Sequence, residues 1–179
     1  MEQFTYEEQK AVAAVLLVVN ELTKVDKHKL AKILFFADQK HLARYGRPIT
    51  SDSYCKMVNG PVPSKIYDAV KGVVNPTKFL SNRELIGKVS VNCNDISPIE
   101  KPDMDQLSET DIECLHESIS ENAPLSFGQL TEKSHGPAWD SARKNGPILF
   151  TEIAKEGNAS EFVMELIKMN LEAEELLRV

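Results

Sequence analysis

The sequence predicts an α+β fold that is predominantly α-helical, a compact helical domain with a small antiparallel strand pair in the middle. Apolar residues recur at helical spacing in several long segments, whereas apolar–polar alternation is confined to a short stretch near residue 90. The composition, 42% apolar and 27% charged, is ordinary for a globular protein. Because 179 residues suffice to bury a core without metal or disulfide support, we expect residues 1–179 to form a single domain.

Two helices are predicted in the first 50 residues. The first spans about residues 6–22, where valine and leucine recur on one side of a helix. The second spans residues 27–45. Asp26 is a suitable N-cap because its carboxylate can accept hydrogen bonds from the first turn, and Gly46 and Pro48 end the helix. One face of the second helix combines Leu30, Ile33, Leu34, Ala37, His41 and Tyr45.

The middle of the chain is predicted to hold the strands. Residues 50–58 lead into an extended piece, and residues 59–63 cannot be helical because two prolines fix φ and restrict the residues before them. Ser64 is expected to cap a helix over residues 65–71 that ends at Gly72. Alternation predicts a strand over residues 88–92, with residues 78–80 as its partner. Residues 98–105 are the expected internal linker.

The second half of the chain is predicted to be helical again. Ser108-Glu-Thr-Asp111 resembles a capping box with aspartate in place of glutamate, and it starts a helix that runs to about residue 121. Ser126 is expected to cap a helix to about residue 134, which His135-Gly-Pro137 interrupts. A turn or two follows over residues 138–144, and the last helix spans about residues 160–177.

Charge and cysteine content exclude several classes of protein. The net charge is −6, with +2 in residues 1–60 and −8 in residues 61–179, so the bulk of the chain repels nucleic-acid phosphates and suits a basic protein partner. Cys55, Cys93 and Cys114 are widely spaced and odd in number, which predicts neither a disulfide framework nor a CxxC metal pair. The longest apolar run is too short to span a bilayer. We therefore expect a cytoplasmic protein without membrane contact.

Three segments in a fixed order carry a family resemblance. They are Lys29-Leu-Ala-Lys-Ile-Leu-Phe-Phe-Ala-Asp38 with His41-Leu-Ala-Arg-Tyr-Gly-Arg-Pro-Ile-Thr50, then Asn59-Gly-Pro-Val-Pro-Ser-Lys-Ile-Tyr67, then Leu125-Ser-Phe-Gly-Gln-Leu130 with His135-Gly-Pro-Ala-Trp139. Together they resemble the signature of SocA-like Panacea-domain proteins, which occur in bacteria and phages beside a toxin gene. The resemblance covers roughly residues 10–145, although residues 75–101 match nothing in it.

The resemblance implies an antitoxin. Such a protein binds and neutralises a cognate toxin, either directly or as an adaptor that delivers the toxin to an AAA+ protease. Neither mechanism requires an active site, so we expect no enzymatic activity, no cofactor and no metal.

Asp38 and His41 are the strongest alternative site. They are three residues apart on one helix face, and with His135 they could hold a metal or act as acid and base in a small hydrolase. The simpler interpretation is a buried histidine that is hydrogen-bonded to Asp38 or to the backbone.

DNA binding is the second alternative. Helix, turn and helix over residues 112–144 are similar to the opening of a winged helix, with Arg143 and Lys144 as possible phosphate or base contacts. Residues 24–47 carry a local charge of +5, but this is typical of a solvated helix flank.

Two further segments are predicted to contact a partner. The Asn59-Gly60-Pro61 turn is either a rigid recognition loop or a simple chain reversal, and Trp139 is either an interface anchor or part of the core. In the last helix, Phe162, Leu166, Met169, Ala173 and Leu176 form a stripe that should pack on the domain. Met164, Ile167 and Leu171 form a second stripe, which either contacts a toxin or a second copy of the chain or is covered by another helix of the same domain; we place the partner contact here.

Overall fold

A computed structural model describes residues 3–177. Within this range the chain is mainly helical, with two small antiparallel sheets, so the predicted fold class is confirmed. The helices are α1 (Glu8–Leu22), α2 (Lys27–Tyr45), α3 (Ser64–Val74), a short 3₁₀ helix (Met104–Gln106), α4 (Glu109–Asn122), α5 (Phe127–Ser134), α6 (Pro137–Ser141), α7 (Phe150–Glu156) and α8 (Glu161–Leu177). No helix of this described part is long and apolar enough to cross a membrane.

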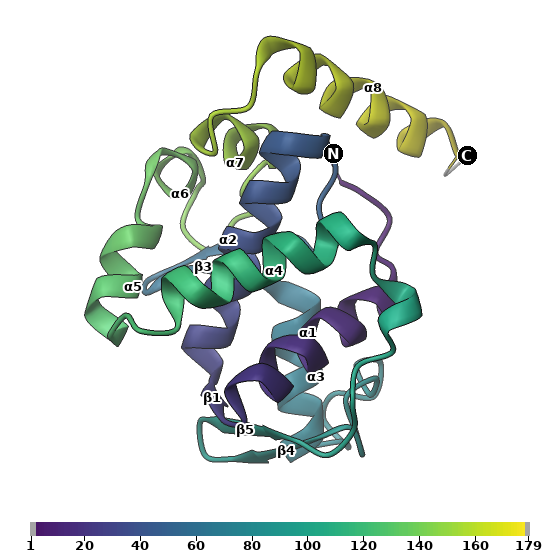
Figure 1. Cartoon of the computed structure of the whole chain (residues 1–179), viewed down its shortest axis with the longest axis vertical. Coiled ribbons are helices and arrows are strands. Elements are labelled where there is room, and N and C mark those ends of the chain that lie inside the picture. The colour runs from purple at the N-terminus through teal and green to yellow at the C-terminus, as the bar shows by residue number, and fades with distance from the viewer. Residues whose placement is uncertain (1–2, 178–179) are drawn as a thin grey trace.

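Helix α2 runs through the centre of the molecule and separates two apolar cores (Figure 1). As predicted, Asp26 caps it by accepting a hydrogen bond from Lys29 N at 2.9 Å, and Gly46 ends it with φ +72°. One side of α2 packs with α1, α3 and α4, and the other packs with α7 and α8. Since both sides are covered, α2 is buried almost all round.

Strands β1 (Val25–Asp26), β4 (Val89–Asn92) and β5 (Asp95–Pro98) form a three-stranded sheet in the order β1-β5-β4. The predicted strand at residues 88–92 is present, but its partner is β5 and not residues 78–80, which form turns. Only Cys93 and Asn94 separate β4 from β5, and Cys93 adopts φ +55°. Two-residue hairpin turns favour positive φ, so this local pairing forms without a long loop.

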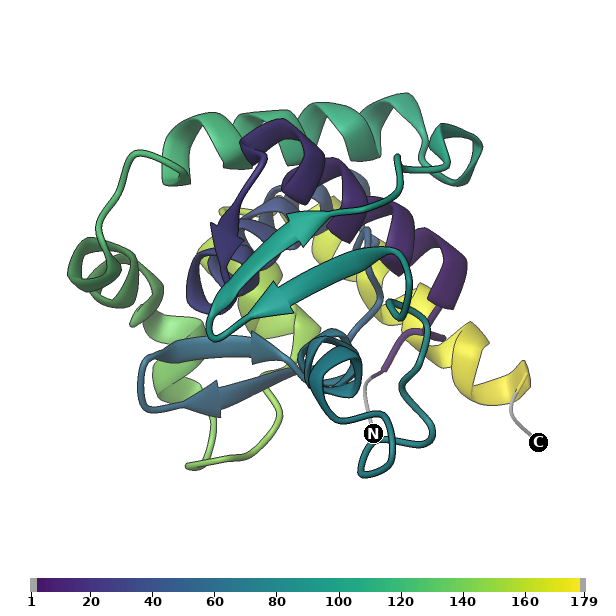
Figure 2. The same cartoon turned by 90° about the horizontal axis from the view of Figure 1, so that it is seen from below.

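Strands β2 (Tyr54–Met57) and β3 (Gly60–Pro63) form a separate hairpin, which Figure 2 shows beside the β4–β5 pair. Lys56 N donates outward to Gly146 O, so the Lys56–Pro61 pair is a non-hydrogen-bonded pair of the β2–β3 ladder. Pro61 and Pro63 therefore lie where no N–H is needed, and the outer edge of β3 presents only carbonyl groups at these positions.

Local capping chemistry sets several of the remaining boundaries. Both predicted capping sites, Ser108 with Asp111 and Ser126 with Gln129, form reciprocal capping boxes. Helix α3 begins at Ser64, but its first N–H groups are capped by Asp52 and not by the Ser64 side chain. The expected linker at residues 98–105 contains the end of β5 and the start of the 3₁₀ helix, and helix α7 was not predicted.

Candidate functional site

Asp38 fixes the chain reversal that follows α2. Its Oδ1 accepts hydrogen bonds from the backbone N–H groups of Ile49 at 2.6 Å and Thr50 at 3.0 Å. Its Oδ2 accepts hydrogen bonds from the hydroxyls of Thr50 at 2.6 Å and Tyr54 at 2.8 Å. Complete burial raises the pKa of Asp38, and these four donors oppose that shift. Because four donors fill the acceptor sites of the carboxylate, Asp38 serves the fold.

His41 is also fully buried, but its partners differ from those expected. Its Nδ1 lies 2.7 Å from the Arg47 carbonyl oxygen, and its Nε2 lies 3.0 Å from Thr110 Oγ1 and 3.1 Å from Asp111 Oδ1. The expected backbone hydrogen bond is confirmed, whereas Asp38 is directed to the 49–54 segment instead. Burial lowers the pKa of His41, so the neutral imidazole is favoured.

His135 does not join Asp38 and His41. Its ring stacks on Trp139 with centroids 3.9 Å apart, while the other two residues have the separate partners described above. Across residues 3–177, no group of three or more His, Cys, Asp or Glu side chains is placed to hold a metal ion. The hydrolase built on these three residues is therefore not the arrangement that the fold produces.

The winged-helix alternative is also not supported by the topology. Helix α6 has only five residues, and Arg143 and Lys144 lie beyond its end. A recognition helix presents several side chains along the major groove, for which five residues are too few. The β4–β5 hairpin precedes α4 in the chain, so it does not follow the helix–turn–helix segment as a wing.

The predicted turn at residues 59–61 is the tip of the β2–β3 hairpin. Gly60 adopts φ +99°, and a Cβ atom placed there would lie 2.2 Å from Ser134 Oγ and 2.8 Å from Lys32 Cε. Gly60 and Pro61 are buried, so only Asn59 of the three predicted residues is exposed. The tip thus packs tightly on α2 and α5 from within and presents Asn59 with its neighbour Val58 outward.

Trp139, predicted independently of the hairpin, lies against it. The indole Nε1 donates a hydrogen bond to the Met57 carbonyl oxygen at 3.0 Å, and Lys56 Nζ lies 4.1 Å from the centre of the ring. The side chain is half-buried and packs at the edge of the second core. The structure therefore brings two of the three predicted contact regions together, with Trp139 supporting the strand that leads to the tip.

A pocket of about 410 Å³ opens beside the hairpin tip. Three exposed apolar side chains surround it: Met57 (39% exposed), Val58 (78%) and Phe127 (55%). Tyr67 and His28 also line it, and the His28 ring stacks on Phe127 at 4.0 Å between centroids. The sequence motifs contained several of these residues, but only the fold shows that α2, α3, α5 and the hairpin meet here.

Two polar groups in this pocket are unusual. Lys32 is fully buried, and its Nζ donates a hydrogen bond to the Pro61 carbonyl oxygen at 2.8 Å. Burial without a carboxylate partner lowers the pKa of Lys32 to about 7. The Nδ1 atom of His28 is buried and has no hydrogen-bond partner among residues 3–177. Buried polar atoms are normally paired, so this one has unused bonding capacity at the pocket.

The two apolar stripes of α8 have exchanged roles relative to the prediction. Ile167 and Leu171 are buried in the second core, and Met164 packs beside them. The expectation that these three residues form a free partner-binding strip is therefore wrong, because α8 uses this face to pack on α2 and α7. The stripe expected to pack inward is largely exposed, with Phe162 at 75% and Met169 at 65%.

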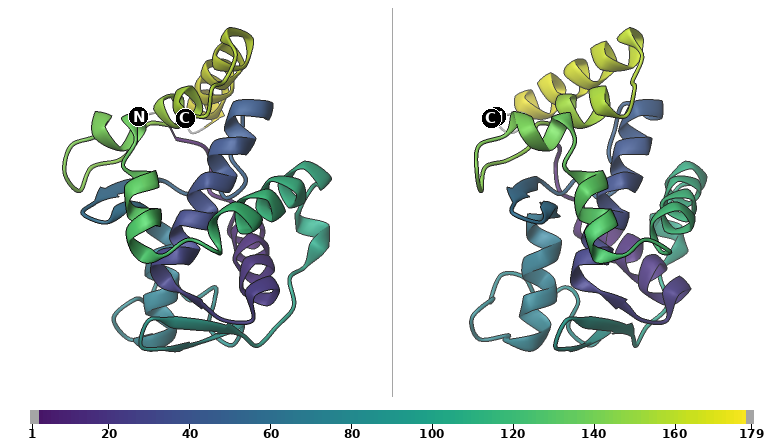
Figure 3. Two further views of the ribbon diagram at one scale, coloured as in Figure 1. Left: turned by 60° about the vertical axis from the view of Figure 1, so that its left-hand side comes forward. Right: turned by 90° about the vertical axis from the view of Figure 1, so that its left-hand side faces the viewer.

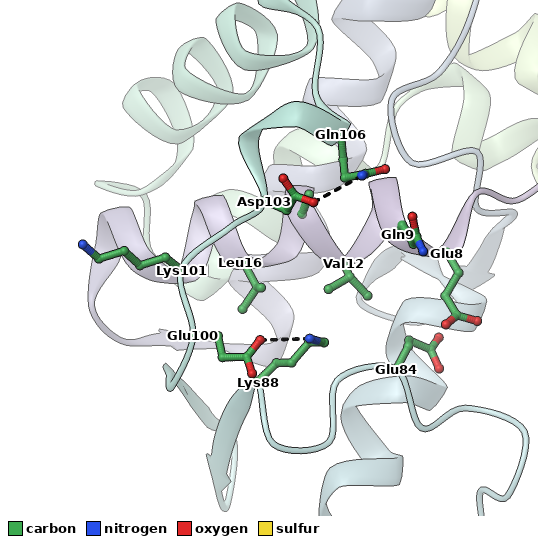
Figure 4. A pocket seen from close by; sticks show the side chains of 11 residues that line it. Glu8, Gln9, Val12, Leu16, Glu84, Lys88, Glu100, Lys101, Asp103 and Gln106 are labelled. Carbon is green, nitrogen blue, oxygen red and sulfur yellow. Dashed lines mark hydrogen bonds and ion pairs between the residues drawn. The ribbon is translucent and has the colours of Figure 1, made fainter.

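A second pocket, of about 370 Å³, lies over α1 and contains none of the predicted site residues (Figure 4). Val12 and Leu16 form its floor, and Glu8 and Glu84 lie at one side of it. Lys88 pairs with Glu100 at 2.9 Å across the opposite side. The lining of this pocket is mostly charged and polar, unlike the apolar lining of the pocket at the hairpin tip.

The chain thus folds into a helical domain with an exposed apolar rim beside the β2–β3 hairpin, and comparison with protein families gives its class. Residues 30–140 match the model of the antitoxin SocA-like, Panacea domain. Since this match covers more than half of the chain, the protein belongs to that family. No curated protein and no solved structure matches the chain.

Family membership assigns an antitoxin-type function in general terms, and antitoxin-like proteins of this kind are generally non-catalytic. The matched region contains α2 from Leu30 onward, the β2–β3 hairpin, α5 and Trp139. It includes nine of the twelve residues that line the hairpin pocket, and Asp26, Lys27 and His28 lie before it. Helix α8 lies outside it.

Proposed function

We propose that this protein neutralises a toxin protein by binding it at the hairpin pocket. The observation that carries the proposal is the apolar rim formed by Met57, Val58 and Phe127 around a pocket of about 410 Å³. Exposed apolar groups gathered at a concave site are typical of protein interfaces, whereas the same residues scattered over a surface would need no explanation.

The rigidity of the hairpin supports this proposal. The Gly60 backbone is wedged against Ser134, the Pro61 carbonyl is held by Lys32, and the Met57 carbonyl is held by Trp139. A surface that is already ordered loses little conformational entropy on binding, so more of the contact energy remains as affinity. In this proposal Asn59 contacts the toxin, while Gly60, Pro61 and Trp139 position the contact surface.

Binding of the toxin is common to direct neutralisation and to an adaptor mechanism. We propose direct neutralisation, in which the toxin stays intact in a stable complex. An adaptor would instead cause the toxin to be degraded by an AAA+ protease. The half-life of the toxin in cells that express this protein separates the two mechanisms, because direct neutralisation predicts an unchanged half-life and an adaptor predicts a shortened one.

The binding site itself is tested with Val58→Glu. The protein is co-expressed with the product of the gene adjacent to its own, and the dissociation constant of the purified pair is measured by calorimetry. Val58 is exposed, so the variant should fold normally, and a charge placed in an apolar contact should weaken binding by about 30-fold or more. The matched control is Val74→Glu, at a valine that is 60% exposed at the end of α3.

The outcomes of this experiment are distinct. If both valine variants bind like the wild type, the hairpin pocket is not the toxin site. If Val74→Glu alone weakens binding, the site lies on α3. Phe127→Ala removes a second rim residue without adding a charge, and it should also weaken binding if the pocket is the contact surface.

A further inference from the structure

Helix α8 lies at one end of the molecule, beyond the C-terminal end of α2, and the β4–β5 sheet lies at the opposite end (Figures 1 and 3). The inner face of α8 is held by Ile167 and Leu171, which are buried in the second core. Asn170 also holds it, because its side-chain amide donates a hydrogen bond to the Gly46 carbonyl oxygen at 3.3 Å. The orientation of the helix is therefore set by the domain, and its opposite face is turned away from the core.

The outer stripe of α8 consists of Phe162, Leu166, Met169, Ala173 and Leu176. Successive members are spaced by four, three, four and three residues, which is the repeat of a coiled-coil seam. Phe162, Met169 and Leu176 are mostly exposed and Ala173 is exposed, whereas Leu166 is half-buried because its side chain packs beside Gly46 at the end of α2. The free part of the stripe is therefore Phe162, Met169, Ala173 and Leu176. The stripe extends over two heptads, or about 21 Å of helix. The length and the spacing of the stripe fit side-by-side packing with one amphipathic helix of a partner.

The charged residues beside the outer stripe indicate the charge that a partner helix should carry. Glu165 and Glu172 flank it on one side and are exposed. On the other side Val163 and Asn170 are half-buried toward the domain, so the two glutamates form the free flank of the stripe. In helix pairs, residues at these flanking positions contact the partner helix and select its charge. A partner with lysine or arginine there gains ion pairs with both glutamates, whereas an acidic partner is repelled.

A second copy of α8 is a poor match for the outer stripe. Within residues 161–177 the flanking positions contain no basic residue, so two copies offer each other no ion pair in either orientation. In an antiparallel pair, Glu165 and Glu172 of the two copies face each other, and like charges at such positions are destabilising. Charge complementarity therefore selects a partner different from the chain itself.

We propose that the outer stripe of α8 is a docking site for a basic amphipathic helix of a partner protein. The site is distinct from the hairpin pocket, lies outside the region matched by the family, and does not depend on the identity of the toxin.

Two synthetic helical peptides of about 21 residues, three heptads each, test this proposal. Both carry leucine at the seam positions, and they differ only in having lysine or glutamate at the flanking positions. Binding to the full chain is measured by fluorescence anisotropy at low ionic strength. The lysine peptide should bind at least about tenfold more tightly than the glutamate peptide, and added salt should reduce the difference because it screens the exposed charges.

Variants of the chain locate the binding on α8. Met169→Lys should abolish binding of the lysine peptide, whereas the control Leu80→Lys, at an exposed leucine far from α8 in the chain, should leave it unchanged. The double variant Glu165→Lys with Glu172→Lys should reverse the preference and bind the glutamate peptide. Circular dichroism establishes that each variant is folded, as expected for exposed positions.

Three results would overturn the proposal: equal binding of both peptides, binding of neither peptide, or a homodimer in sedimentation velocity that Met169→Lys dissociates. The last result would assign the outer stripe to a second copy of the chain. The Val58→Glu variant should bind the lysine peptide normally, so failure of the hairpin site and failure of the α8 site are distinguishable.

Discussion

Lys32 is a residue whose burial opposes folding. An ammonium group without a carboxylate partner is expensive to bury, and the lowered pKa of about 7 expresses that cost. Its Nζ holds the Pro61 carbonyl, which lies on the outer edge of β3 where no backbone N–H reaches it. The lysine thus provides the hydrogen bond of a buried acceptor and holds the hairpin in place. In the proposed function, its burial lowers the stability of the fold but keeps the binding surface rigid.

Lys32→Met should therefore stabilise the protein at neutral pH. Methionine has a similar length and removes the buried charge, although it leaves the Pro61 carbonyl unpaired, so we expect a net gain of about 1–3 kcal/mol in the free energy of unfolding at pH 7. Toxin affinity should fall, because the hairpin is less firmly held. Urea denaturation measures the first effect and calorimetry the second. A destabilised variant with unchanged affinity would contradict this account of Lys32.

At the level of the elements, local signals predicted most of the helices. Asp26, Gly46 and Ser108 act through hydrogen bonds or backbone angles within a few residues of themselves, so their effects are visible in the sequence. The capping of α3 by Asp52 and the pairing of β5 with the two residues of β1 depend on segments that meet only in the folded chain. Sequence reasoning therefore missed them.

In the candidate site, too, features set by local sequence were predicted and features set by the tertiary fold were not. The turn at residues 59–61 was predicted because two prolines and a glycine leave the backbone few choices, but the pairing of β2 with β3 was not. The pocket was not, since Phe127 and Tyr67 come from distant segments of the chain. On α8 the helical period showed two apolar stripes, but the period does not tell which stripe meets a neighbouring helix. The prediction chose the wrong one, and Ile167 is buried.

The hairpin tip should tolerate no side chain at Gly60. Gly60→Ala places a Cβ atom 2.2 Å from Ser134 Oγ in a backbone conformation with φ +99°, so we expect a loss of about 2–4 kcal/mol in the free energy of unfolding. Gly87→Ala is the matched control, because Gly87 has φ +80° but no atom within 4 Å of the added Cβ. Only backbone strain of about 1–2 kcal/mol should appear there. Similar losses in both variants, measured by urea denaturation, would show that the Ser134 contact is unimportant.

On the scale of the whole molecule, buried titratable groups give stability a pH dependence with two opposing parts. Burial raises the pKa of Asp52 to about 6 and also raises the pKa of Asp38, so the folded state holds these protons more tightly than the unfolded state. Stability from these groups is present at low pH and is lost as pH rises through their raised pKa values, which for Asp52 means from about 4 to 6. Lys32 acts in the other direction, because its lowered pKa makes stability increase as pH rises from about 7 to 10.

A single variant isolates the contribution of Asp52 to this pH dependence. Asp52→Asn removes one titrating group, so the fall between about pH 4 and 6 should become smaller by about 1–3 kcal/mol, while the contribution of Asp38 remains. Asp111, Glu117, His28 and His41 have lowered pKa values and act with the opposite sign. The wild type and the variant both contain these four groups, so their contributions cancel in the difference between the two proteins. Urea denaturation of the wild type and the variant at pH 4, 5, 6 and 7 gives that difference directly. It should change steadily in favour of the variant as pH rises to about 6 and then level off, and a difference that does not vary with pH would mean that Asp52 titrates as in the unfolded chain.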